Sequence, residues 1–233
     1  MRLVIFGASG PTGLHVVRQA LAADHETVAV TRRPDAFPLK AQGLEVVAAD
    51  VTDEPAVDRA VAGADAVIST FGVPYSRKPV SVYSDGISAI LAAMATHDVS
   101  RLVCVSSTTV SEQDAPGESL WWRRAVIPLL RNVVGRTLYD DMERMEAIVR
   151  ANPVEWTIVR PGGLFDTDTP TGTVSVTTAR QRGRYTARAD LAQVLVREAA
   201  GASAHPRAVV EAITNAKPAS PLRTFWKEAF GSR

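Results

Sequence analysis

The chain has 233 residues, of which 46% are hydrophobic and 22% are charged. This composition supports a sizeable buried core and excludes an intrinsically disordered chain. The formal net charge of +1 excludes a field strong enough to recruit nucleic acid or a membrane surface, and no apolar run reaches the length of a membrane span. A lone cysteine, Cys104, excludes an intrachain disulfide and suits a reducing compartment. Because the N-terminus enters an expected strand without a signal peptide, we expect a cytoplasmic protein.

The first expected strand leads into the most informative stretch of the chain. Residues 2–6 are an apolar run short enough for a buried strand, and Gly7, Gly10 and Gly13 follow at a three-residue spacing. Apolar residues then recur at helical spacing. Strand, glycine turn and helix are the context that a dinucleotide-binding fingerprint requires, although a glycine-rich turn without a ligand is the alternative.

Each part of this stretch has a physical role toward a dinucleotide. Gly7 lets the chain turn off the strand, Gly10 lets a pyrophosphate approach the backbone, and Gly13 lets the helix pack close to the strand. The helix N-terminus offers free N–H groups and a positive dipole end to phosphates. Ser9 and Thr12 can add hydroxyl donors.

Apolar runs alternate with helical patterns along the rest of the chain. We expect further strands at residues 27–31, 44–48, 64–70, 101–106, 155–159 and 209–213, and helices at 54–61, 82–97, 139–150 and 188–200. We also expect a short extra strand at 173–178, a strand break at 160–163 and a tail helix that contains Phe225 and Trp226.

This alternation predicts parallel strands joined by right-handed crossovers. The expected fold class is therefore α/β, with a doubly wound Rossmann-type sheet and a small C-terminal substrate lobe. We expect a single domain over residues 1–233, with a variable substrate region at about 108–138 and 161–187.

The end of the second expected strand favours NADPH over NADH. Folds that prefer NAD usually place a carboxylate there for the ribose 2′-hydroxyl, whereas this chain has Thr31, Arg32 and Arg33. Two guanidinium groups suit a 2′-phosphate, which arginine can bind in a bidentate manner. A solvated basic loop is the alternative.

Four motifs resemble, in order and spacing, the atypical short-chain dehydrogenase/reductase superfamily. They are residues 7–13, Asp50-Val51, Val105-Ser106-Ser107 and Thr157-Ile158-Val159-Arg160-Pro161. The pattern is most similar to NAD(P)H-binding proteins related to biliverdin reductase B, a flavin reductase, and to the NmrA-like regulators. The resemblance covers residues 1 to about 215, and it is specific for the fold but not for one activity.

The resemblance implies the position of a cofactor. Asp50 and Val51 would flank the adenine, unless Asp50 only caps the next turn, and the backbone at residues 70–72 would pass the cofactor, unless it is a simple turn. Ser107 would face the nicotinamide and the substrate, which makes it a candidate catalytic residue or a cofactor-positioning hydroxyl. The full expected cofactor set is Gly7, Ser9, Gly10, Pro11, Thr12, Gly13, Arg32, Arg33, Asp50, Val51, Thr70, Phe71, Gly72, Ser106, Ser107 and Pro161.

A tyrosine–lysine catalytic pair is missing from the sequence. Many short-chain reductases use Tyr-x-x-x-Lys, in which lysine lowers the pKa of the proton-donating phenol. None of the four tyrosines has a lysine four residues later; Tyr139 has Glu143, which disfavours a tyrosinate. The NmrA-like pattern often has a lysine near position 142, where this chain has Met142.

The substrate side is less well defined by the sequence. Trp121, Trp122 and the arginines nearby can form a membrane or partner surface, or a pocket wall or lid, which the variable region of the fold favours. No His or Cys pattern has metal-ligand spacing, so we expect no metal. The expected substrate-pocket residues are Thr108, Trp121, Trp122, Met142 and Gly162.

These observations favour one function and leave a second open. We expect an NADPH-dependent oxidoreductase that passes hydride to a small conjugated acceptor, a flavin or a quinone, because such acceptors take a proton from water. The alternative is an NADP(H)-sensing regulatory protein that contacts another protein. A sugar-nucleotide epimerase or dehydratase is disfavoured by the short chain and the missing catalytic pair. The sequence leaves the oligomeric state open.

Overall fold

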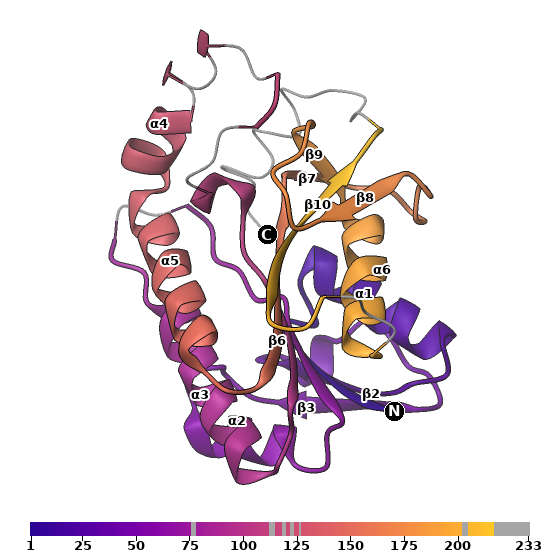
Figure 1. Cartoon of the computed structure of the whole chain (residues 1–233). Coiled ribbons are helices and arrows are strands. Elements are labelled where there is room, and N and C mark those ends of the chain that lie inside the picture. Colours follow the sequence, from indigo (N-terminus) through magenta and orange to yellow (C-terminus); the bar gives the residue numbers. More distant parts are fainter. Residues whose placement is uncertain are drawn as a thin grey trace.

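An eight-stranded sheet forms the middle layer of the structure, which is a computed structural model that describes residues 1–75, 78–111, 115–117, 120–121, 124–125, 127–201 and 205–216 (Figure 1). The strand order is β3-β2-β1-β4-β5-β6-β10-β8, and only β8 runs antiparallel to its neighbour. The strands are β1 (Arg2–Phe6), β2 (Glu26–Thr31), β3 (Leu44–Ala48), β4 (Ala66–Ser69), β5 (Arg101–Val105), β6 (Glu155–Pro161), β8 (Val174–Thr177) and β10 (Ala208–Thr214).

Helices cover both faces of this sheet (Figure 1). The longer ones are α1 (Pro11–Ala22), α2 (Glu54–Val61), α3 (Val82–Thr96), α5 (Arg136–Ala151) and α6 (Arg188–Ala199). Shorter pieces are the 3₁₀ turns η1 (Pro34–Ala36) and η2 (Thr108–Val110), α4 (Ile127–Leu129) and the π-helical η4 (Leu130–Val134).

Strand β1 shows how the two faces are filled. Successive side chains of a strand point to opposite faces. Leu3 and Ile5 pack in the cluster that holds α1 and α6, whereas Val4 and Phe6 pack in the cluster that holds α2, α3 and α5. Because both faces are covered, the strand is a continuous apolar run, as is typical of parallel sheets.

The expected fold class is confirmed, and most expected elements lie within two residues of their observed bounds. The expected strand break at 160–163 is present but short: β6 ends at Pro161, Gly162 belongs to no strand, and β7 (Gly163–Phe165) follows. Strand β7 pairs in parallel with β9 (Tyr185–Ala187). The helix expected from residue 139 begins at Arg136. The expected tail helix at Phe225 lies outside the described residues, and the extent of the substrate region remains a prediction.

The strand order reverses between β1 and β4. Helix α1 leaves β1 toward one face, and α2 enters β4 from the other face. In open α/β sheets such a switch point leaves a crevice outside the carboxyl ends of the strands, where ligands bind. None of the described helices is long and apolar enough to cross a membrane.

Candidate functional site

The turn between β1 and α1 places its three glycines in three different surroundings. Gly7 has φ +77°, and a Cβ there would lie 2.5 Å from the backbone nitrogen of Phe71. A Cβ on Gly13 would lie 2.2 Å from the Gly7 carbonyl oxygen. At Gly10 the only described atom near a Cβ would be that same oxygen, at 3.2 Å. Gly7 and Gly13 therefore serve close packing, and Gly10 faces open space.

The N-terminus of α1 has no side-chain cap. Gly10 is the N-cap residue and Pro11 follows in the first turn, while the Leu14 N–H donates to the Gly10 carbonyl at 2.9 Å. Early N–H groups of a helix have no partner within the helix. Thr12, half-buried in the same turn, stands beside them. An anion placed here would meet unshared donors and the positive end of the helix dipole.

Hydroxyl groups tie this turn to the end of β2. The Thr31 hydroxyl donates to Ser9 Oγ at 3.2 Å and accepts from the Arg33 N–H at 3.3 Å. Arg32 and Arg33 are both exposed, and Arg32 Nη1 lies 3.9 Å from Asp50 Oδ2. Thr31 thus links the glycine turn to the segment that carries both arginines, and their contact with a 2′-phosphate stays a prediction.

Asp50 has a local structural partner. Its Oδ1 accepts hydrogen bonds from the Thr52 N–H at 3.0 Å and the Thr52 hydroxyl at 2.8 Å. These bonds, with Arg32 nearby, lower the pKa of the Asp50 carboxyl. Asp50 therefore caps the next turn, as the alternative interpretation predicts. Its other oxygen, Oδ2, lies toward Arg32. A contact of Asp50 with adenine stays a prediction.

The backbone after β4 lies beside the glycine turn. The Thr70 hydroxyl donates to the Phe6 carbonyl at 3.0 Å. The centroids of the Phe71 and Tyr83 rings lie 5.9 Å apart. A Cβ added to Gly86 would lie 2.9 Å from the Val51 methyl groups and 3.1 Å from Phe71 Cζ. Gly72 is exposed. Val51 and Phe71 therefore meet at Gly86 of α3, although they are far apart in the sequence, and contacts of residues 50–51 and 70–72 with a cofactor stay predictions.

The two serines after β5 face different partners. Ser106 is buried, and its hydroxyl donates to Glu146 Oε1 of α5 at 2.6 Å. Ser107 is half-buried, and its Oγ accepts from the Thr109 N–H at 3.2 Å as the cap of η2. Ser107 therefore keeps its hydroxyl away from Glu146, in a local cap, and its contact with nicotinamide remains a prediction.

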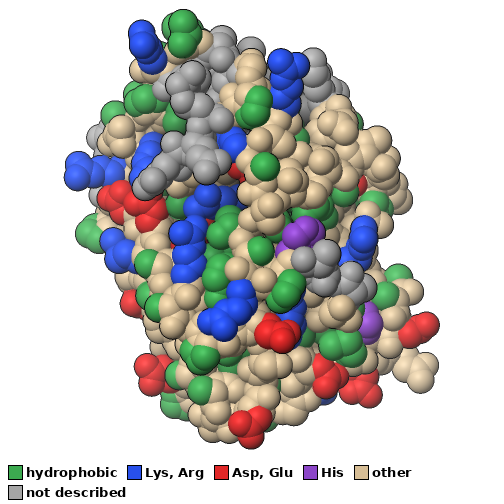
Figure 2. Space-filling view, viewed as in Figure 1, with side chains coloured by type: hydrophobic (Ala, Val, Ile, Leu, Met, Phe, Trp, Pro, Cys, Tyr) green, Lys and Arg blue, Asp and Glu red, His purple; other side chains and the backbone are tan. Residues whose placement is uncertain are grey.

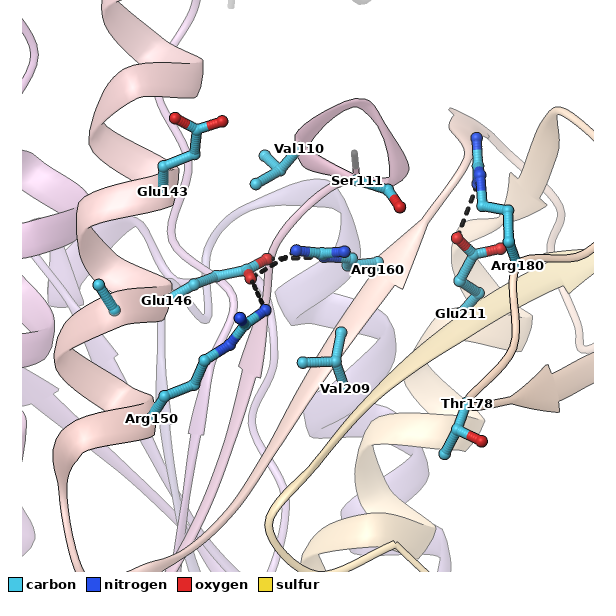
Figure 3. A pocket seen from close by; sticks show the side chains of 11 residues that line it. Val110, Ser111, Glu143, Glu146, Arg150, Arg160, Thr178, Arg180, Val209 and Glu211 are labelled. Carbon is cyan, nitrogen blue, oxygen red and sulfur yellow. Dashed lines mark hydrogen bonds and ion pairs between the residues drawn. The ribbon is translucent and has the colours of Figure 1, made fainter. Parts of the chain in front are cut away.

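The sequence interpretation missed Glu146. This carboxylate is 3% exposed and accepts four hydrogen bonds: from Ser106, from Arg160 Nε at 2.8 Å and Nη2 at 2.6 Å, and from Arg150 Nη2 at 2.8 Å (Figure 3). Its position one helical turn from Met142 and from Arg150 was the available signal. Helical spacing alone placed it on the expected apolar side of α5, where a charge requires a partner.

A cavity of about 510 Å³ lies beside this carboxylate, between α5 and strands β6 and β10 (Figure 3). On its far side Arg180 Nη1 contacts Glu211 Oε1 at 2.7 Å. Basic side chains gather on this face of the molecule (Figure 2). Besides the residues already named, apolar side chains line the cavity: Val110, Ala147 and Val209.

Two tyrosines meet above the first turn of α5. The Tyr75 and Tyr139 hydroxyl oxygens lie 2.7 Å apart, and either can donate. Tyr139 is buried, and Glu143, where a lysine would stand, is paired with Arg131. The phenol of Tyr139 therefore contacts a second phenol, and the position four residues later holds an ion-paired glutamate in place of a lysine.

None of the expected substrate-pocket residues that the structure describes is among the side chains lining the cavity. Thr108 and Met142 are half-buried, and Pro161, which was expected at the cofactor, is buried at the end of β6. Gly162 donates its N–H to the Thr186 hydroxyl at 2.9 Å, and a Cβ there would lie 2.6 Å from the Arg184 carbonyl. Trp121 is 69% exposed, and Trp122 lies outside the described residues. A role for either tryptophan in a pocket stays a prediction.

Metal and thiol chemistry find no support in the described part of the chain. No group of three or more His, Cys, Asp or Glu side chains there is placed to hold a metal ion. Cys104 is fully buried in β5, and burial raises the pKa of its thiol. An inert core cysteine results.

Comparison with known proteins decides the family. Residues 7–201 match the family described as NAD(P)H-binding. The chain belongs to this family. The matched region begins at Gly7, the first residue of the glycine turn. Binding of a nicotinamide nucleotide follows from membership of the family.

Solved structures and curated proteins agree with this assignment. A Veillonella parvula short-chain dehydrogenase/reductase in complex with NADP superimposes with a TM-score of 0.76 at 16% identity, covering 94% of this chain and 99% of that one. ChuY of Escherichia coli O157:H7, described as an anaerobilin reductase, gives 0.72 at 25% identity, covering 94% and 100%. The Bacillus subtilis protein described as "uncharacterized sugar epimerase YhfK" is 28% identical over 202 residues, 84% of this chain and 86% of that protein.

Matches of higher identity are shorter. Uncharacterized proteins of Mycobacterium tuberculosis and Mycobacterium bovis are 36% identical over 108 residues, 46% of this chain. The chain spans 12% of their length.

The residues of the glycine turn fit such a cofactor. A Cβ at Gly10 would occupy the space in front of the uncapped helix N-terminus, and the glycine leaves that space open. Backbone donors and open space together are what a pyrophosphate requires.

Proposed function

We propose that the protein is an NADPH-dependent oxidoreductase that reduces a small conjugated acceptor of the flavin or quinone type. The observation that carries the proposal is an uncapped helix N-terminus, open at Gly10, which follows β1 and is separated by one strand, β4, from the β5 end that leads to Ser107. Membership of the NAD(P)H-binding family supports a nicotinamide cofactor. The similarity to a protein described as an anaerobilin reductase supports reduction of a conjugated acceptor.

The chain contributes binding and orientation. Gly10 and the first turn of α1 hold a pyrophosphate, Arg32 and Arg33 offer donors to a 2′-phosphate, and the Ser107 hydroxyl orients a reacting carbonyl by hydrogen bonding. A bound dihydronicotinamide supplies a hydride, so that NADPH, a quinone and one proton yield NADP⁺ and a hydroquinone. Because that proton comes from water, no side chain has to donate it, and holding the two reactants together supplies most of the rate.

A steady-state assay tests the proposal. NADPH oxidation is followed at 340 nm with FMN, with a soluble quinone and with no acceptor. We expect acceptor-dependent oxidation that saturates with acceptor concentration, and a slower rate for Ser107→Ala with unchanged NADPH binding. Oxidation no faster than in the absence of protein, with NADPH bound, would contradict the proposal.

The second candidate is an NADP(H)-sensing regulatory protein. It is favoured by the same lack of a tyrosine–lysine pair, since a sensor needs no proton donor. A sensor would bind NADP⁺ and NADPH with different affinities and would not turn over any of the acceptors. Titration with both nucleotides beside the kinetic assay therefore separates the two functions.

A further inference from the structure

We infer that Arg150 and Arg160, oriented by Glu146, form a binding site for an anionic group, a carboxylate or a phosphate, on the acceptor. The inference rests on the proposed function, because it identifies the ligand as the acceptor. It adds a substrate class: conjugated molecules that carry a negative charge.

The charges around the cavity do not cancel at this point. Arg180 pairs with Glu211 and Arg131 with Glu143, one arginine to one glutamate. Among the carboxylates that line the cavity in the described part of the chain, Glu146 pairs with two arginines, Arg150 and Arg160. Among these pairs, one positive charge is therefore in excess beside the cavity.

The hydrogen-bond inventory points the same way. Both oxygens of Glu146 are occupied, by four donors in total. A guanidinium carries five N–H donors. Within the described ranges, Arg160 uses only Nε and Nη2, and Arg150 uses only Nη2, so Nη1 of both and Nε of Arg150 have no protein acceptor. An incoming anion could accept hydrogen bonds from these N–H groups, because Glu146 already has four donors and does not require them.

Burial distinguishes this arrangement from a purely structural ion pair. Ser106 and the two donors of Arg160 already satisfy a buried carboxylate, and the Arg160 side chain is 13% exposed. Arg150 is 48% exposed and lines the cavity. The second arginine thus presents its fork to solvent at the cavity wall, where planar bidentate recognition of carboxylate or phosphate is favoured.

The cavity also suits the rest of such an acceptor. Val110, Ala147 and Val209 give it apolar wall, as a conjugated ring requires. Ser106 contacts Glu146 directly, and Ser107, the next residue, lies at the expected nicotinamide end. Ser106 therefore connects Glu146, which orients the two arginines, to the strand end that carries Ser107.

FMN and riboflavin form a matched pair for the test, since they share the isoalloxazine ring and differ in the phosphate. Binding is measured by flavin fluorescence with the protein saturated with NADP⁺, so that phosphate does not enter the glycine turn or contact Arg32 and Arg33. We expect FMN to bind about tenfold more tightly than riboflavin, and Arg150→Gln to weaken FMN binding about five- to tenfold without changing riboflavin binding.

Two further variants control for charge and fold. Arg150→Lys keeps the charge but loses the fork, so we expect an intermediate FMN affinity. Arg59→Gln removes an exposed arginine from α2, away from the cavity, and we expect it to leave both flavins unaffected. Arg160→Gln leaves the buried Glu146 with fewer partners, so its thermal stability is measured before its binding.

Competition at constant ionic strength separates the two anion chemistries. Displacement of FMN by inorganic phosphate or by benzoate, and not by benzamide, supports the inference and names the preferred anion. Equal affinities for FMN and riboflavin in both wild type and Arg150→Gln, without displacement by either anion, would overturn it. If neither flavin binds, calorimetric titration of phosphate and benzoate decides, and no uptake of either overturns it. These are equilibrium measurements, so they are independent of whether the protein turns over NADPH.

Discussion

Asp141 of α5 accepts a 2.5 Å hydrogen bond from the Ser84 hydroxyl of α3, although the two residues are 57 positions apart. The other oxygen of Asp141 accepts from the Tyr83 N–H at 2.9 Å. Ser81, the N-cap residue of α3, makes no side-chain cap bond. The carboxylate of one helix therefore caps the N-terminus of another, and this cap fixes α5 against α3 on the face that carries the site.

Removing this cap is expected to destabilise the protein. Asp141 is fully buried, so Asp141→Ala leaves the Tyr83 N–H without its side-chain acceptor, removes the Arg144 contact and leaves the Ser84 hydroxyl only the Ser81 carbonyl at 3.2 Å. We expect the free energy of unfolding to fall by about 2–4 kcal/mol. Asp140→Ala is the control, because Asp140 makes only a 3.7 Å surface ion pair with Arg136, and we expect a change below about 0.5 kcal/mol. Urea denaturation measures both; equal losses would mean that the cap contributes nothing.

Gly10→Val is expected to separate nucleotide binding from folding. Its Cβ would meet only the Gly7 carbonyl, at 3.2 Å, so the fold should survive while the pyrophosphate space is filled. We expect loss of NADPH binding in a fluorescence titration with a nearly unchanged melting temperature. Gly13→Ala should behave in the opposite way, because its Cβ would lie 2.2 Å from backbone oxygen and overpacking costs about 1–3 kcal/mol. Unchanged affinity in Gly10→Val would reduce the stretch to a simple turn.

NADPH is expected to bind more tightly than NADH. Charge-assisted bonds from Arg32 and Arg33 to a 2′-phosphate contribute about 1.5–3 kcal/mol in favourable cases, or one to two decades in affinity. Both arginines are exposed, so we expect the lower end, about tenfold. The double variant Arg32→Gln/Arg33→Gln should abolish the difference by weakening NADPH alone. Equal affinities in the wild type would assign these side chains to a solvated loop.

Stability at high pH is expected to depend on Tyr83. Burial raises the pKa of Tyr83 to about 12, from an ordinary value of 10. The unfolded chain therefore loses this proton first, and the free energy of unfolding falls as the pH rises from 10 toward 12, by on the order of 2–3 kcal/mol. Below pH 10 the group contributes no pH dependence. Tyr83→Phe, referenced to its own stability at pH 8, should show a flatter alkaline limb; identical slopes would contradict the assignment.

The sheet was predictable because its strands are short apolar runs and its crossovers carry helical spacing. Residues 54–61 were predicted with both bounds, since Asp53 is a side-chain cap that can be read in the sequence and accepts from the Ala56 N–H at 3.2 Å. Strands β7 and β9 were not predictable, because three residues are too few for any periodicity. Their pairing depends on Thr186, which joins Gly162 to the Ala212 carbonyl.

The candidate site was predictable only where its chemistry is local. Glycine spacing placed the turn, and Arg32 and Arg33 followed from their position after a strand. Helical spacing placed Glu146 on the apolar side of α5, but its partners could not be assigned, because Arg160 belongs to a different element and Ser106 lies 40 residues earlier. Long-range pairs of this kind leave no periodic pattern in the sequence. The Tyr75–Tyr139 contact was unforeseen for the same reason.

That tyrosine pair allows the proposed chemistry to be tested directly. If the acceptor takes its proton from water, Tyr139→Phe should lower kcat for flavin or quinone reduction by less than about tenfold, because it keeps the ring and removes only the hydroxyl. Tyr75→Phe removes the other hydroxyl of the same 2.7 Å contact and is the matched control. We expect similar small effects from both. General acid catalysis typically contributes about 10²–10⁴-fold. A fall of a hundredfold or more in Tyr139→Phe alone, with NADPH binding intact, would identify Tyr139 as the proton donor and exclude a site that relies on water.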